Sequence, residues 1–147
     1  MSQYASVLLA LPLISAFFVP IFKRLDVPVM KYLTSITIIQ SVIAGWVFAN
    51  VFGIGSGAGG PIIVVISGFN PPIAINLYIG KFAALFVLVI ALVSFFASIF
   101  SWESIEVEPK DKYVMLFLLL MLGSTGMVTT GDLFNLFVFM EITVISA

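Results

Sequence analysis

Five long apolar stretches divide this chain of 147 residues, and they constrain its fold more than any other feature. They cover about residues 5–22, 32–52, 82–102, 113–130 and 133–147. The first four are each close to the ~20 residues that an α-helix needs to cross the hydrocarbon core of a bilayer. Only 9% of the residues are charged, whereas a soluble domain has roughly 25%. The sequence therefore predicts an all-α membrane protein with about five transmembrane helices in a single membrane domain, residues 1–147.

Residues 53–80 have a different character from the apolar stretches. They begin with a glycine-rich segment, Gly53 to Gly60, and continue with two β-prone runs, 61–67 and 73–79. The sequence Gly68-Phe-Asn-Pro-Pro72 between the runs has the residues typical of turns. We expect a linker followed by a short β-hairpin at the membrane surface. The glycines are not followed by Gly-Lys-Ser/Thr, so they are only a weak indication of a phosphate-binding loop.

The basic residues predict the orientation of the helices. Five of them lie in or beside the connections 23–31 and 103–112, namely Lys23, Arg24, Lys31, Lys110 and Lys112. Only Lys81 lies on the other side. Because positive residues remain preferentially on the cytoplasmic side, both connections are predicted to be cytoplasmic. The N-terminus and the hairpin would then face the outside of the cell membrane.

Several classes of function are excluded or disfavoured by what the sequence lacks. It contains no cysteine and no histidine. Disulfides, thiolate sites and cysteine-ligated clusters are therefore excluded, and the commonest metal ligand is missing. The formal net charge of −1 disfavours nucleic acid as a partner. We expect no cofactor, no metal site and no catalytic site belonging to this chain alone; whether it serves a redox-driven enzyme complex stays open.

Glu141 is the outstanding candidate for a functional side chain. If a helix begins after Asp132, Glu141 lies about 12–13 Å along it, near the middle of a ~30 Å hydrocarbon core. A charged group there is disfavoured by roughly 2.5–3.5 kcal/mol on the mildest insertion scale. Apolar residues on its own helix face would favour the neutral carboxyl: Phe134, Phe137, Val138 and Ile145. A titrating or ion-pairing role is favoured over a structural carboxylate hydrogen-bonded within the bundle.

Hydroxyl side chains precede Glu141 in the sequence. Ser124 and Thr125 lie between Gly123 and Gly126, and Thr129 and Thr130 follow one turn later. One interpretation is a polar path that leads toward Glu141. The other, which we favour, is close helix packing through small residues with hydroxyls bonded across the interface.

Asp132 has two interpretations as well. It stands at the expected start of the last helix, where a carboxylate caps the free amides near Asn135. A role in ion entry is the less favoured alternative.

The residues around Glu141 resemble a known family. The segment from Thr130 to Ile142 is similar to a signature of the large antiporter-like subunits. These occur in Mrp-type sodium/proton antiporters, in membrane-bound hydrogenases and their sulfur-reducing relatives, and in respiratory complex I. Leu9-Ala-Leu-Pro-Leu-Ile14 and Gly68-Phe-Asn-Pro-Pro-Ile73 are similar to the same family. The resemblance implies that Glu141 belongs to a proton-translocating axis and pairs with a lysine on a later helix.

Two features depart from the family pattern. Gly80-Lys81 stands where an acidic residue is common, and family members have about fourteen helices. A helix over 133–147 is only ~22 Å long, short of a ~30 Å core. No lysine in the chain is expected near Glu141. We therefore expect an N-terminal portion, split or truncated, which needs other membrane chains for the missing helices and the lysine.

The expected function is that of a subunit in a multi-subunit complex that translocates protons, sodium ions or both. One alternative is a structural subunit of such a complex that translocates nothing. A second alternative is a small homo-oligomeric drug/proton exchanger that uses one membrane glutamate per chain.

Overall fold

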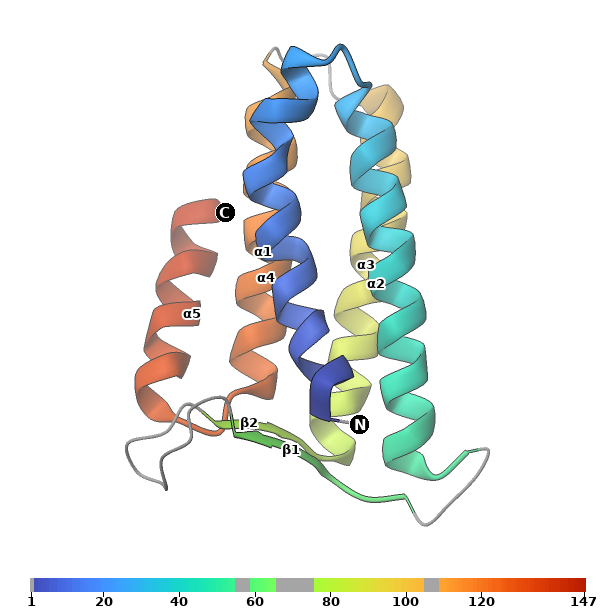
Figure 1. The fold of residues 1–147 in the computed structure, drawn as a ribbon, viewed down its shortest axis with the longest axis vertical. Helices are drawn as coiled ribbons and strands as arrows, with labels where there is room; N and C mark the ends of the chain where they lie inside the picture. Colours follow the sequence, from blue (N-terminus) through green and yellow to red (C-terminus); the bar gives the residue numbers. More distant parts are fainter. Residues whose placement is uncertain (1, 55–58, 66–75, 105–108) are drawn as a thin grey trace.

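The computed structural model describes residues 2–54, 59–65, 76–104 and 109–147. The described residues form five α-helices and one two-stranded sheet. In chain order they are α1 (Ser2–Arg24), α2 (Val29–Phe52), β1 (Ile62–Val65), β2 (Asn76–Ile79), α3 (Lys81–Ser104), α4 (Lys110–Thr129) and α5 (Leu133–Ser146). Figure 1 shows α1 to α4 side by side as an elongated bundle, with the hairpin across one end and α5 beside α4.

Four of the helices, α1 to α4, are long and apolar enough to cross a membrane, and α5 is apolar but shorter. This confirms the predicted fold class: an all-α membrane protein with five helices and a small hairpin.

The residues that flank α2 are typical of helix ends. Pro28 immediately precedes its first residue, and Gly53 closes it in the left-handed conformation with φ 72°. Glycine adopts that conformation without the steric cost of a Cβ atom.

The hairpin is antiparallel and pairs Ile62 with Ile79 and Val65 with Asn76. Both described strands lie within the expected runs 61–67 and 73–79, and residues 66, 67 and 73–75 of those runs lie outside the described residues. The predicted turn at 68–72, the middle of the glycine-rich segment at 55–58 and the acidic residues Glu106 and Glu108 lie outside the described residues. Alternate side chains of the strands are buried, so one face of the hairpin covers the end of the bundle.

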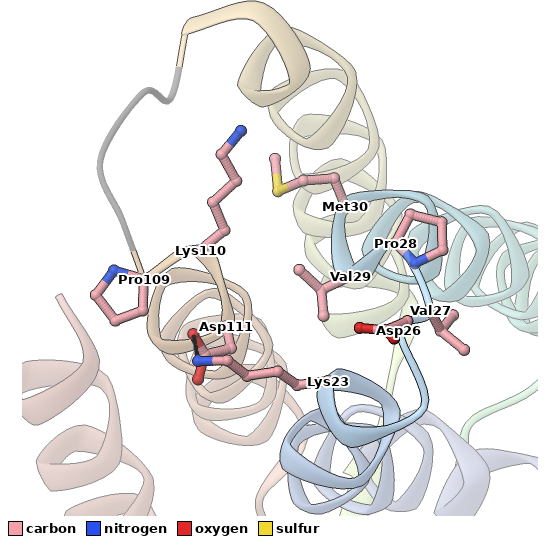
Figure 2. A pocket seen from close by; sticks show the side chains of 9 residues that line it. All are labelled: Lys23, Asp26, Val27, Pro28, Val29, Met30, Pro109, Lys110 and Asp111. Atoms are coloured by element: carbon pink, nitrogen blue, oxygen red, sulfur yellow. Dashed lines mark hydrogen bonds and ion pairs between the residues drawn. The ribbon is translucent and has the colours of Figure 1, made fainter.

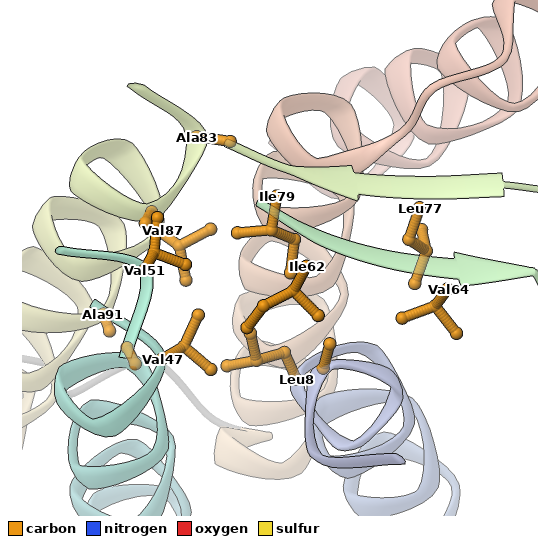
Figure 3. Packing of buried hydrophobic residues seen from close by; sticks show 13 residues of the cluster. Leu8, Val47, Val51, Ile62, Val64, Leu77, Ile79, Ala83, Val87 and Ala91 are labelled. Atoms are coloured by element: carbon orange, nitrogen blue, oxygen red, sulfur yellow. The ribbon is translucent and has the colours of Figure 1, made fainter. Parts of the chain in front are cut away.

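The apolar core has two parts. One lies beneath the hairpin, where Ile62, Leu77 and Ile79 pack with Leu8 of α1 and Val47 of α2 (Figure 3). The other contains residues from α1, α2 and α4 and lies toward the opposite end of these helices: Ala16, Val19, Leu33, Ile36, Val114, Leu118 and Met121. Helices α2 and α3 are joined in addition by hydroxyls, since Thr37 and Ser98 form a buried hydrogen bond of 3.0 Å.

A proline inside α1 has a specific consequence for packing. Pro12 has no backbone N–H, so the carbonyl of Leu8 lacks its usual helical donor. The Nε2 atom of Gln40 on α2 donates to this carbonyl at 2.9 Å. Gln40 is only 1% exposed. A side chain of the neighbouring helix thus replaces the missing backbone hydrogen bond, as apolar surroundings require.

Candidate functional site

Glu141 lies on α5, eight residues after the first residue of that helix, which places it about 12 Å along the axis. Its side chain is exposed on the surface of the isolated chain. Within the described ranges of the structure, no hydrogen bond or ion pair reaches its carboxyl group. The structure therefore presents Glu141 on an outer face of the bundle.

The direction of Glu141 follows from the way α5 packs against α4, beside which it lies in Figure 1. Asn135 and Ser146 are the buried residues of α5. Phe139 and Thr143 lie on the same stripe and face two glycines of α4. At 3.6 residues per turn, Glu141 lies about 155° around the helix from the middle of this stripe. The packing of α5 on α4 thus points Glu141 away from the bundle.

The apolar residues expected beside Glu141 share its outward face. Phe134 is 72% exposed, Phe137 56%, Val138 36% and Ile145 76%. These side chains do not shield the carboxyl inside this bundle. They form an apolar outer surface around it, which can keep the carboxyl dry only when lipid or another protein segment covers them.

Asp132 caps α5. Its side chain accepts a hydrogen bond from the backbone N–H of Phe134 at 3.3 Å, and its own carbonyl accepts from the N–H of Leu136 at 3.0 Å. The donor is thus Phe134 rather than an amide nearer Asn135. Asp132 lies nine residues before Glu141, about 13 Å along the helix, so the two carboxyl groups do not share one site.

Three of the four hydroxyl side chains, those of Ser124, Thr129 and Thr130, donate to nearby backbone carbonyls. Ser124 donates to the carbonyl of Leu120 at 2.8 Å. Thr129 donates to the carbonyl of Thr125 at 2.9 Å, and both threonines are 1% exposed. Thr130 donates to the Asp132 carbonyl at 3.2 Å. Among the described residues no hydroxyl bonds to Glu141, and a polar path through them stays a hypothesis.

The start of α5 is held by the hairpin, a contact that the sequence did not reveal. Thr130 and Gly131 are extended along the free edge of β2, where Thr130 pairs with Leu77. The N–H of Gly131 donates to the carbonyl of Asn76 at 2.8 Å. The link from α4 to α5 therefore acts as a short third strand. The hairpin is thereby bonded to the segment that leads into α5, the helix that carries Glu141.

Gln40 is a buried polar residue that no sequence motif marks as functional. Its Oε1 atom is buried and has no hydrogen-bond partner among the described residues. The available signal was a glutamine in the middle of the apolar stretch 32–52 together with Pro12 in the preceding stretch. These two residues indicate a hydrogen bond between helices only when α1 and α2 are known to be neighbours.

A charged hollow lies at the end of the bundle away from the hairpin. The pocket has a volume of about 410 Å³ and is lined by the end of α1, the connection to α2, the start of α2 and the start of α4. Figure 2 shows Lys23 reaching across to Asp111, while Lys110 extends in a different direction. The Nζ atom of Lys23 and the carboxylate of Asp111 are 2.9 Å apart. This ion pair joins α1 to α4 and leaves Lys110 as the unpaired cation of the pocket's described lining.

Comparisons with known proteins place the chain among relatives from ion-transporting and respiratory complexes. No protein-family model matches it. A Na(+)/H(+) antiporter subunit of Bacillus subtilis (strain 168) is 29% identical over 149 residues, which span 100% of this chain and 29% of that protein. An NADH-quinone oxidoreductase subunit of Desulforudis audaxviator (strain MP104C) is 35% identical over 85 residues, 56% of this chain and 17% of that protein.

Two solved structures share the fold. A chain of the membrane-bound sulfane sulfur reductase, an archaeal respiratory membrane complex, superposes with a TM-score of 0.89 at 57% identity. The match covers 99% of this chain and 29% of that one. A chain of the Mrp complex from Dietzia sp. DQ12-45-1b gives a TM-score of 0.77 at 25% identity, over 99% of this chain and 27% of that one.

This chain thus spans under a third of the length of the relatives it matches. With its four membrane-spanning helices and these relatives, it is a multi-pass membrane protein. It is related over its whole length to the antiporter-like subunits of membrane complexes, and its five helices and hairpin form a partial antiporter-like fold.

Proposed function

We propose that this chain is part of a membrane subunit that translocates protons, sodium ions or both within a multi-subunit complex. Glu141 contributes the ion-handling carboxyl group. The observation that carries the proposal is an exposed carboxyl in the middle of an apolar helix, directed away from the helix that α5 packs on. The names of the relatives, a sodium/proton antiporter subunit and a respiratory oxidoreductase subunit, support the same class of function.

The energetics of Glu141 argue for a partner. A carboxylate facing lipid at this depth is disfavoured by at least roughly 2.5–3.5 kcal/mol. The six basic residues of the sequence lie at or near helix ends, away from the middle of α5: Lys23, Arg24, Lys31, Lys81, Lys110 and Lys112. We propose that a lysine from another membrane segment or subunit covers the outer face of α5 and pairs with Glu141.

Such a pair gives Glu141 two states. Desolvation favours its neutral form, and a nearby ammonium group favours the charged form. When the lysine approaches, Glu141 releases its proton, and when the lysine moves away, Glu141 binds one again. Protons are then taken up and released in step with the movement of the partner, which is the elementary step of a relay.

We further propose a location in the cell membrane as one membrane domain, with the N-terminus and the hairpin outside. The described basic residues Lys23, Arg24, Lys31, Lys110 and Lys112 lie at the end of the bundle away from the hairpin. By the positive-inside rule that end faces the cytoplasm.

One alternative has an observation in its favour. The hydroxyls of Ser124 and Thr129 bond to carbonyls of their own helix rather than lining an open path. This suits a structural subunit that braces the complex and carries no ions. A homo-oligomeric exchanger is less well supported, because the relatives belong to multi-subunit complexes. Migration of this chain only as a small dimer in blue-native electrophoresis would favour the exchanger.

The test is ion-coupled transport by membrane vesicles that contain the assembled complex. Glu141→Gln keeps the shape of the side chain but cannot carry a charge, and we expect assembly to persist while transport is lost or strongly reduced. Glu103→Gln, an exposed glutamate at the end of α3, is the matched control and should transport normally. Asp132→Asn should be mild, because asparagine caps a helix nearly as well. Assembled Glu141→Gln complexes that transport at the wild-type rate would favour the structural subunit.

A further inference from the structure

We infer that Gly123 and Gly126 of α4 are positioning residues that set the direction in which Glu141 points. The inference rests on the proposed role of Glu141 and adds which residues determine the direction of its side chain. Glu141 does not contact α4. It lies on the far side of α5, so its direction depends on how closely α5 lies against α4 and at which rotation.

Gly126 makes room for an aromatic ring. A Cβ atom added at Gly126 would overlap Cγ, Cδ1 and Cε1 of Phe139. The three atoms all belong to one side chain, so the ring occupies the space that any other residue at this position would need. Phe139 lies two residues before Glu141 on the face of α5 turned toward α4.

Gly123 makes room for the backbone of α5. A Cβ atom there would lie 3.0 Å from the carbonyl oxygen of Phe139 and 3.0 Å from the backbone nitrogen of Thr143, and it would overlap the Thr143 hydroxyl. That hydroxyl is itself bonded to the Phe139 carbonyl at 2.8 Å. The closest approach at Gly123 is thus partly between backbones, which no change of a side chain can relieve.

The two contacts flank Glu141 in sequence, at Phe139 and Thr143. They lie on successive turns of the same stripe, so together they set how closely α5 approaches α4 and resist its rotation. Because α4 is the helix on which α5 packs, a larger residue at either glycine displaces the carboxyl of Glu141 relative to a partner on the opposite side.

Alanine variants in the assembled complex test the inference. Gly126→Ala should reduce ion-coupled transport on the order of 10- to 100-fold, the effect of a misplacement of about 1 Å. Gly126→Ala combined with Phe139→Ala should recover most of the activity, because the overlapping ring is gone. Gly123→Ala should not be rescued by Thr143→Ala, because the backbone atoms remain. Gly45→Ala is the control: an added Cβ on α2 meets nothing within 4 Å, and transport should be unchanged.

Two further readouts separate positioning from stability. The midpoint of the pH dependence of transport should shift in Gly126→Ala and should return to the wild-type value in the double variant. The rate at which a hydrophobic carbodiimide modifies Glu141 should change in Gly126→Ala and should return to the wild-type rate in the double variant. Gly45→Ala should alter neither readout.

The inference is overturned if Gly126→Ala transports normally with an unshifted midpoint, or if the double variant is inactive although Phe139→Ala alone is active. If the Gly126→Ala complex does not assemble, the inference requires that the double variant does assemble. A double variant that also fails to assemble would overturn the inference. Glu141→Gln is measured alongside. Loss of transport in Glu141→Gln with normal transport in Gly126→Ala refutes the positioning alone, whereas normal transport in Glu141→Gln refutes the proposed function.

Discussion

Gln40 and Glu141 are both polar side chains in apolar helices, yet the fold gives them different surroundings. Gln40 is 1% exposed, and its amide replaces a missing backbone donor on α1. Its role is explained by the stability of the bundle. Glu141 is exposed and has no bonding partner in the described part of the chain. A polar group that stability does not explain is the better candidate for function.

The role of Gln40 can be tested by pairing it with Pro12. Gln40→Leu leaves the buried Leu8 carbonyl without a donor, and we expect a loss of about 1–3 kcal/mol in unfolding free energy. In a Pro12→Ala background the backbone N–H of residue 12 returns, so Gln40→Leu should cost clearly less there. Reversible unfolding in detergent measures the cycle. Ser35→Ala, which removes an exposed hydroxyl, is the control. Equal costs in both backgrounds would contradict the proposed replacement.

At the residue scale, the sequence predicted what local rules determine. The depth of Glu141 follows from its distance to the helix start, and the capping position of Asp132 follows from its residue type before an apolar run. The direction of Glu141 could not be predicted, because large apolar residues occur on every face of 133–147. In the structure, the burial of Asn135 and Ser146 and the fit of Phe139 and Thr143 against two glycines identify the inner face.

At the scale of elements, the hairpin does more than cover the end of the bundle. Its second strand binds the link between α4 and α5 through Thr130 and Gly131. The sequence predicted the hairpin from β-prone runs and turn residues. It could not predict this third pairing, because Asn76 and Gly131 are far apart in the chain and Gly131 does not belong to a recognisable strand pattern.

A single backbone donor tests the link. Gly131→Pro removes the N–H that bonds to the Asn76 carbonyl. We expect faster hydrogen exchange in the first turn of α5. Gly131→Ala keeps the N–H, and its Cβ would lie 3.4 Å from the nearest atom, an ordinary contact. It should therefore exchange like the wild type. Unchanged protection of the α5 amides in Gly131→Pro would show that the hairpin does not hold this helix.

At the scale of the whole molecule, the ends of the bundle differ in charge. The described cations at the end away from the hairpin predict that this end is cytoplasmic. A cysteine at Ile54, which is 64% exposed just after α2, should react with an impermeant thiol reagent added to intact cells. A cysteine at Ser104, the last residue of α3, should react only after the cells are opened. The reverse pattern would invert the orientation.

The central claim is that Glu141 changes its protonation state as the complex moves ions. Infrared difference spectroscopy of the assembled complex, comparing resting and energised states, measures this directly. We predict a band of a protonated carboxyl group that changes between the two states, disappears in Glu141→Gln and persists in Glu103→Gln. A difference spectrum of Glu141→Gln identical to that of the wild type, in a complex that still transports ions, would contradict the claim.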